Sequence, residues 1–180
     1  MPLQKERYTS CDYWALPDGQ RAELINGKFY DMAPPSRIHQ RISAEIARIF
    51  GNYIIEHNGS CQVYPAPFAV NLDAEDENWV EPDISIICDH TKLTERGCSG
   101  APDLIVEIVS PSSRKLDYAT KSGLYLATGV REYWIVDPAR ETTMVYFEND
   151  DTTPCIYQFS VEIPCGIFDG LKIRIADLIF

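Results

Sequence analysis

The sequence predicts an α/β (α+β) fold in which a mixed central sheet is flanked by helices. Apolar strands such as 104–109 and 132–137 are separated by helical segments, a hairpin signal stands near the N-terminus, and alternating strands stand near the C-terminus. Strands and helices that follow one another in this way pack as helices on a sheet. The chain has 180 residues without an evident linker or repeat, so we expect one domain over 1–180.

The N-terminal part is expected to form a helix, a hairpin and a longer helix. Cap residues and prolines precede the two helical segments, and Asn-Gly is a strong two-residue hairpin signal. The predicted elements are a helix from Ser10 to Trp14, strands 22–25 and 28–32 around Asn26-Gly27, and a helix from about Arg37 to Phe50 with Gly51 near its end.

The remaining chain consists mainly of strands. Short apolar or alternating runs, bounded by proline, glycine or acidic turns, are typical of strands. The predicted elements are strands 61–63, 68–72, 83–88 and 104–109, a helix from about 113 to 128 capped by Gly129, a strand at 132–137, an antiparallel pair at 142–148 and 156–161, and a strand at 171–175.

Composition narrows the class of protein. The sequence contains neither a membrane-length apolar run nor a signal-peptide core, so we expect a cytoplasmic location without membrane contact. The net charge of −11 argues against a generic nucleic-acid-binding surface. Most of the acid falls in expected loops, however, while the two predicted helices are mildly basic. The six cysteines lack zinc spacing, and we expect free thiols.

Two acids stand at comparable places in buried strands. Glu107 lies in the middle of the apolar run 104–109, and Asp83 opens the strand before it, directly after Pro82. A buried carboxylate needs a cation, a hydrogen-bond partner or a proton. If the strands pair, both carboxylates converge, and a hard ion such as Mg²⁺, with Mn²⁺ as the alternative, suits them. The other interpretation of Asp83 is a turn cap.

Two further charged residues are candidates for the same site. Lys121 follows Asp117 by one helical turn, and a lysine beside a metal ion can orient or deprotonate bound water or neutralise a phosphate. Such a pair is also a common surface feature of helices. Glu45 falls within the apolar stripe of the first long helix. It is either a further metal ligand or a structural contact to a tyrosine or arginine.

Three segments together resemble a known family. Pro82-Asp83 followed 24 positions later by Glu107 resembles the PD-(D/E)XK nuclease superfamily. More closely, EPDISIIC, GAPDLIVEIVSPSSRKLDYATK and GVREYWIVDP are similar to the Uma-two family of restriction-endonuclease-like proteins. The likeness extends from about Tyr8 to the C-terminus.

The resemblance implies a restriction-endonuclease-like fold and Mg²⁺-dependent cleavage of DNA. By position, Asp83 and Glu107 would be metal ligands and Glu45 the acid of the first core helix. The lysine of the superfamily would fall at Val109, which cannot serve, and the family resembled here points to Lys121 on the following helix. Lys115 is the fallback candidate.

A second hypothesis is a protein that keeps the fold but acts as a DNA-associated or protein-binding module. The charge of −11 and Val109 favour this alternative. Hydrolysis of RNA or another phosphate ester is a third. Because nucleases that cut both strands often pair, a homodimer is also expected, with Leu178-Ile179-Phe180 as either core or interface.

Overall fold

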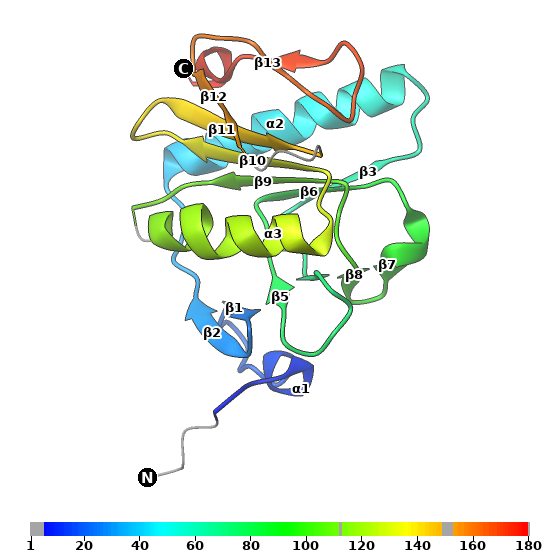
Figure 1. Ribbon diagram of the computed structural model, residues 1–180, viewed down its shortest axis with the longest axis vertical. Helices are drawn as coiled ribbons and strands as arrows, with labels where there is room; N and C mark the ends of the chain where they lie inside the picture. The colour runs from blue at the N-terminus through cyan, green and yellow to red at the C-terminus, as the bar shows by residue number, and fades with distance from the viewer. Residues whose placement is uncertain (1–5, 112, 149–152, 180) are drawn as a thin grey trace.

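The computed structural model describes residues 6–111, 113–148 and 153–179. A six-stranded sheet with the order β12-β11-β10-β9-β6-β3 forms its centre (Figure 1). Strands β9 and β10 are parallel and the other neighbours are antiparallel, so the predicted mixed sheet is confirmed. The strands are β3 (Gln62–Pro65), β6 (Ile84–Ile87), β9 (Leu104–Ile108), β10 (Glu132–Asp137), β11 (Thr142–Phe147) and β12 (Cys155–Gln158).

Helices cover the two faces of this sheet. Helix α2 (Arg37–Glu56) packs on one face, and a π-helix over Leu116–Lys121 that continues into α3 (Ser122–Thr128) packs on the other (Figure 1). Successive strand residues point to opposite faces. In β9, Leu104, Val106 and Ile108 join the core under α2, whereas Ile105 joins the core under α3. Glu107 therefore points toward α3.

A second sheet, with the order β2-β1-β5-β4-β8-β7, lies beside the first. It carries the N-terminal hairpin, which the structure confirms: Asn26 and Gly27 both have positive φ, 51° and 73°, as a tight hairpin turn requires. The remaining elements are α1 (Ser10–Tyr13), β1 (Ala22–Ile25), β2 (Lys28–Asp31), β4 (Val70–Asn71), β5 (Trp79–Val80), β7 (Leu93–Thr94), β8 (Gly97–Ser99), β13 (Ile163–Pro164), β14 (Lys172–Ile173) and 3₁₀ turns at His90–Lys92 and Ile175–Leu178.

Helix boundaries differ from the prediction at two places. Helix α2 continues past Gly51 to Glu56, because the buried stripe continues through Phe50 to Ile54. The cap of α1 is Thr9, not Ser10: its backbone N–H and hydroxyl both donate to the Asp12 carboxylate. At the other end of the chain, Leu178 is buried in the core under α2, and Phe180 lies outside the described residues.

The prediction of free thiols is wrong for one pair of cysteines. Cys61 and Cys88 form a disulfide. The pairing of β3 with β6 sets Gln62 opposite Ile87. One position further along the same register, Cys61 lies opposite Cys88. Their separation of 27 positions in the sequence gave no sign of this. No helix within the described residues is long and apolar enough to span a membrane.

Candidate functional site

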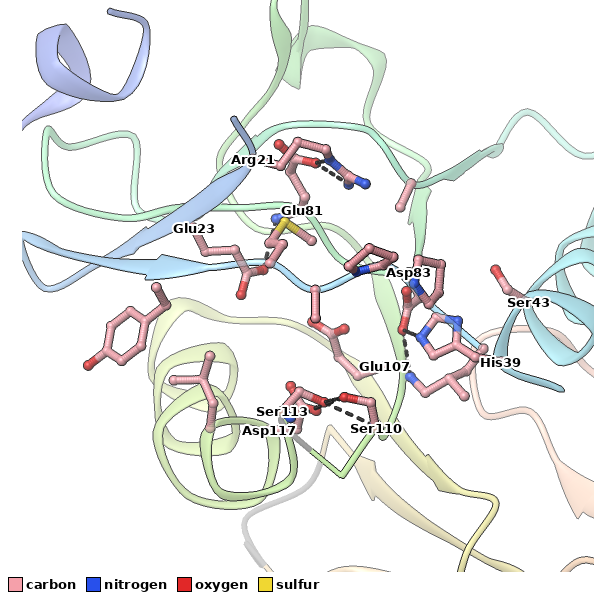
Figure 2. A pocket seen from close by; sticks show the side chains of 18 of the residues that line it. Arg21, Glu23, His39, Ser43, Glu81, Asp83, Glu107, Ser110, Ser113 and Asp117 are labelled. Atoms are coloured by element: carbon pink, nitrogen blue, oxygen red, sulfur yellow. Dashed lines mark hydrogen bonds and ion pairs between the residues drawn. The ribbon is translucent and has the colours of Figure 1, made fainter. Parts of the chain in front are cut away.

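A cavity of about 360 Å³ lies where the two sheets and the two main helices meet. The hairpin of β1 and β2, the first turn of α2, the start of β6, the end of β9 and the π-helix all contribute to its lining. Figure 2 shows Glu23, Asp83, Glu107 and Asp117 around one space. The cavity thus collects the acids of segments far apart in the sequence.

Asp83 and Glu107 meet because their strands pair. Ile84 lies opposite Val106 in the antiparallel ladder of β6 and β9. One step further along the same register places Asp83 beside Glu107, at the spacing of a cross-strand pair. The Ile108 N–H also donates to Asp83 Oδ2 at 2.7 Å. The two carboxylates therefore lie side by side and line the same cavity, as predicted.

The Lys121 ammonium lies among three buried carboxylates. Its Nζ is 2.8 Å from Glu23 Oε2, 2.9 Å from Glu107 Oε1 and 3.5 Å from Asp117 Oδ1. The Tyr125 hydroxyl donates to the same Glu107 oxygen at 2.6 Å. The structure therefore brings Lys121 to Glu107, as the resemblance implied, and adds a tyrosine.

Burial and these contacts shift the pKa values of Glu107 and Lys121. Burial raises the pKa of Glu107 well above its ordinary value, and the Lys121 charge opposes that rise. Burial alone would lower the pKa of Lys121, but attraction to its three carboxylate partners outweighs it and holds that pKa well above the usual range. Lys121 is therefore a cation at neutral pH. It can orient water or neutralise a phosphate, but it cannot take up a proton.

A π-helix carries both Asp117 and Lys121. Its wide turn frees backbone carbonyl groups, and the Asp117 carbonyl oxygen accepts from the hydroxyls of Ser122 at 2.9 Å and Tyr133 at 3.3 Å. Such segments are rare and occur frequently at functional sites. The two side-chain donors explain how this turn is held in place beside the cavity.

His39 reaches the cavity from the first turn of α2. Its Nε2 lies 3.1 Å from Asp83 Oδ2 (Figure 2). The sequence placed His39 at the edge of the apolar stripe, as a surface or hydrogen-bonding residue. The structure buries it and gives it the Asp83 carboxylate as partner.

Two other candidates, Glu45 and Lys115, do not line the cavity, and neither does Val109 at the position of the superfamily lysine. Glu45 pairs with Arg41 and Arg48 on the surface of α2, which corresponds to the alternative of a structural arginine contact. It follows His39 by six residues and so lies about 120° around the helix from the face that meets Asp83. Lys115 is exposed, and Val109 is buried in the core under α3.

Glu23 is the site residue that sequence reasoning missed. It lies in β1, only 3% exposed, and accepts from the Glu81 N–H at 3.0 Å as well as from Lys121. A signal was present, because Glu23 shares a face of its strand with Ile25 in the same way that Glu107 shares one with Ile105. The apolar run around Glu23 is shorter than the run around Glu107 and ends in a turn, so the two positions do not look alike in the sequence.

The charge of the cavity fits a divalent cation. Six carboxylates line it, against one lysine and one arginine. The recorded contacts of Asp83 use Oδ2 and those of Glu107 use Oε1, which leaves Oδ1 and Oε2 for an ion. Among the described residues, no group of three or more His, Cys, Asp or Glu side chains is arranged as a complete metal cage. Mg²⁺ commonly binds through one or two carboxylates plus water and phosphate, so this pair suits it.

Comparison with known proteins decides the family. A family model described as "Putative restriction endonuclease" matches residues 8–175. The chain belongs to the Uma2 family. The match covers every segment that lines the cavity, so the family likeness and the cavity concern the same part of the chain.

The chain is also similar to individual proteins. The chain is 26% identical to the uncharacterized protein slr1290 of Synechocystis sp. over 150 residues, covering 83% of this chain and 76% of that protein. It is 25% identical to sll1609 of the same organism, covering 66% and 67%. A crystal structure described as a putative nuclease belonging to DUF820 from Anabaena variabilis superposes with a TM-score of 0.77 at 21% identity, covering 94% of this chain and 96% of that one. The restriction-endonuclease-like fold of this Uma2 protein is thereby shown.

Proposed function

We propose that this Uma2 protein is a Mg²⁺-dependent endonuclease that hydrolyses DNA phosphodiester bonds. The observation that carries the proposal is the cross-strand pair Asp83 and Glu107, which faces a cavity beside the buried cation of Lys121. A surplus of carboxylates repels a phosphate unless a divalent cation is bound between them. The family description is consistent with this chemistry.

Each residue of the cavity has a distinct role in this proposal. Asp83 and Glu107 would hold the ion, while the oxygens that already have protein partners keep those contacts. A bound ion would supply an activated water and polarise the phosphate. Lys121 stays protonated and stabilises negative charge on the phosphate or orients the water, rather than acting as a general base.

Glu23, and not Glu45, is a further acid of the cavity, and its role differs from the one that the sequence suggested for Glu45. The Glu23 carboxylate holds the Lys121 ammonium from the side of the small sheet, opposite Glu107. Asp117 approaches the same ammonium at a longer distance of 3.5 Å. These two acids fix the position of the cation without being needed as metal ligands.

Cleavage of supercoiled plasmid in the presence of Mg²⁺ tests the proposal. We expect Asp83→Asn and Glu107→Gln each to lower the rate by at least about 100-fold, since each removes a charge that holds the ion. Glu45→Gln is the matched control, because it makes the same change on the surface of α2 and should leave the rate unaltered. Cleavage by Glu107→Gln at the wild-type rate would refute the assignment.

The alternative of a catalytically inactive binding module has one observation in its favour. Val109 occupies the position of the superfamily lysine and is buried in the core, so activity depends on Lys121 alone. Calorimetric titration separates the two hypotheses. Mg²⁺ and Mn²⁺ binding that is the same in the wild type and in an Asp83→Asn/Glu107→Gln double variant would favour the module.

A further inference from the structure

We infer that His39 is a positioning residue that orients the Asp83 carboxylate for cation binding. The inference rests on the proposed function, because it concerns the ion that Asp83 would hold. The sequence suggested no more for His39 than a surface or hydrogen-bonding role. In the structure, the His39 ring contacts Asp83, one of the two carboxylates that the proposed function requires.

The geometry fixes His39 firmly. Its backbone N–H donates to the Ser36 N-cap hydroxyl at 3.3 Å, and the residue is only 9% exposed. Its Nε2 lies 3.1 Å from Asp83 Oδ2, the oxygen that also accepts from the Ile108 N–H. The His39 ring at the start of α2 and the backbone of β9 thus both contact the same oxygen atom of Asp83.

The hydrogen-bond chemistry determines which ring nitrogen carries the proton. Asp83 Oδ2 can only accept, so the hydrogen on Nε2 is present whether the ring is neutral or charged. The other nitrogen, Nδ1, is buried and has no partner within the part of the chain that the structure describes. Burying a polar ring atom without a partner is unfavourable. Burial of the His39 ring therefore does not itself stabilise the fold. Its contact with the Asp83 carboxylate explains its position better.

Two donors on one oxygen have a directional consequence. An aspartate carboxylate otherwise rotates broadly about its last bond. The Ile108 N–H and the His39 Nε2–H both hold Oδ2, so Oδ1 is left as the oxygen for a cation. Groups that orient metal-binding side chains in this way typically contribute 10–100-fold to metal affinity.

Calorimetric titration of the folded protein with Mg²⁺ and with Mn²⁺ tests the inference. We expect His39→Ala to weaken the binding of both ions by about 10–100-fold and to the same extent. His39→Gln should bind nearly as the wild type, because its amide N–H can reach the position of Nε2. His39→Asn, whose amide reaches only the position of Nδ1, should behave like the alanine variant.

Ser43→Ala is the matched control. Ser43 lines the same cavity one turn further along α2, and this change should leave both affinities unaltered. Thermal unfolding shows whether each variant is folded. If the alanine variant does not fold, the comparison of the Gln and Asn variants carries the test.

Two results would overturn the inference. Unchanged affinity in both His39→Ala and His39→Asn would show that the ring does not orient Asp83. A loss confined to Mn²⁺ would show that the ring is itself a ligand, since a nitrogen donor favours Mn²⁺ over Mg²⁺. Asp83→Asn separates this failure from failure of the proposed function. If Asp83→Asn also binds both ions as the wild type does, the proposed function fails too.

Discussion

When no metal ion is bound, the Lys121 ammonium supplies the positive charge that balances the buried carboxylates around it. The ammonium contacts Glu23, Glu107 and Asp117, and all four side chains are at most 5% exposed. Coulomb attraction is strong in such a setting, and so is the repulsion among the acids once the cation is removed. Lys121 therefore has a structural role that is separate from its proposed part in the reaction.

Removing this cation should make the fold depend on added divalent ions. We expect Lys121→Met to lower the free energy of unfolding in EDTA by about 3–5 kcal/mol, because buried carboxylates lose their counter-charge. Mg²⁺ should restore part of the loss. Thermal and urea unfolding measure both effects, with Lys115→Met on the exposed turn before it as the control. A Lys121→Met protein as stable in EDTA as the wild type would contradict this account.

Glu107 should make the stability of the metal-free protein depend on pH. Its pKa is raised above 4.5 by burial, so its stabilising contribution is complete below about pH 4.5 and is lost as pH rises through the raised pKa. Glu107→Gln cannot ionise. Its stability advantage over the wild type should therefore grow above pH 4.5 by about 1.4 kcal/mol per pH unit until Glu107 is ionised. Urea unfolding in EDTA between pH 4.5 and 8 measures this, and parallel profiles would contradict it.

Among the elements, β10 ties the C-terminal segment to the main sheet through Glu132. This buried carboxylate accepts from Trp134 Nε1 at 2.7 Å and from the backbone N–H groups of Gly166 and Ile167 at 2.8 and 2.9 Å. Together with the Cys165 thiol at 3.6 Å, these donors compensate for the hydration that the carboxylate loses on burial. A buried acid in a strand can thus be structural, as Glu132 is, or lie at a candidate site, as Glu107 does.

Loss of the Glu132 carboxylate should destabilise the fold. Glu132→Ala leaves the buried Trp134 and Cys165 donors and the part-buried N–H groups of Gly166 and Ile167 without this acceptor. We expect the free energy of unfolding to fall by about 3 kcal/mol. Glu148→Ala is the control, because Glu148 pairs with Arg131 at the exposed surface and such pairs contribute little. Urea unfolding at neutral pH measures both. A change of less than about 1 kcal/mol in Glu132→Ala would contradict the structural role.

Local signals explain which elements and site residues the sequence revealed. Asn26-Gly27 and the apolar strand around Glu107 are determined by neighbouring residues, and both were predicted. The end of α2 was not, because burial of Ile54 outweighs the weak helix preference of Gly51. Glu45 was assigned to the site from the helical stripe and from its position in the family resemblance. That stripe shows which face is buried, but it does not show which part of the fold that face meets.

On the scale of the whole molecule, the Cys61–Cys88 disulfide joins the ends of β3 and β6 across a separation of 27 positions. Cross-linking a loop of this size restricts the unfolded chain. The double variant Cys61→Ser/Cys88→Ser should therefore be less stable than the oxidised protein by about 3–4 kcal/mol. Urea unfolding with and without a thiol reductant measures this, with Cys11→Ser/Cys155→Ser as the control. Equal stability of the oxidised protein and the double variant would contradict the expectation.

Other properties of the whole molecule depend on more than local sequence. The disulfide, the contact of Glu23 with Lys121 and the contact of His39 with Asp83 each join residues far apart in the sequence, which no local pattern encodes. Binding of DNA, a single domain over the whole chain and a homodimer stay predictions. The acidic composition bears on the site only in part, because six of the 27 Asp and Glu residues line the cavity.

The ladder that sets Asp83 beside Glu107 also determines how long this pair survives when the protein opens locally. Glu107 lies in the central sheet and Asp83 directly precedes its strand β6, and core strands are among the last parts of a protein to exchange their amide hydrogens. Glu23 arrives with the small outer sheet, where several strands have only two residues. Fluctuations of that sheet would carry Glu23 away from Lys121 while leaving the pair intact. Opening of that sheet would therefore remove one carboxylate partner of Lys121 before it disturbed the two acids proposed to hold the ion.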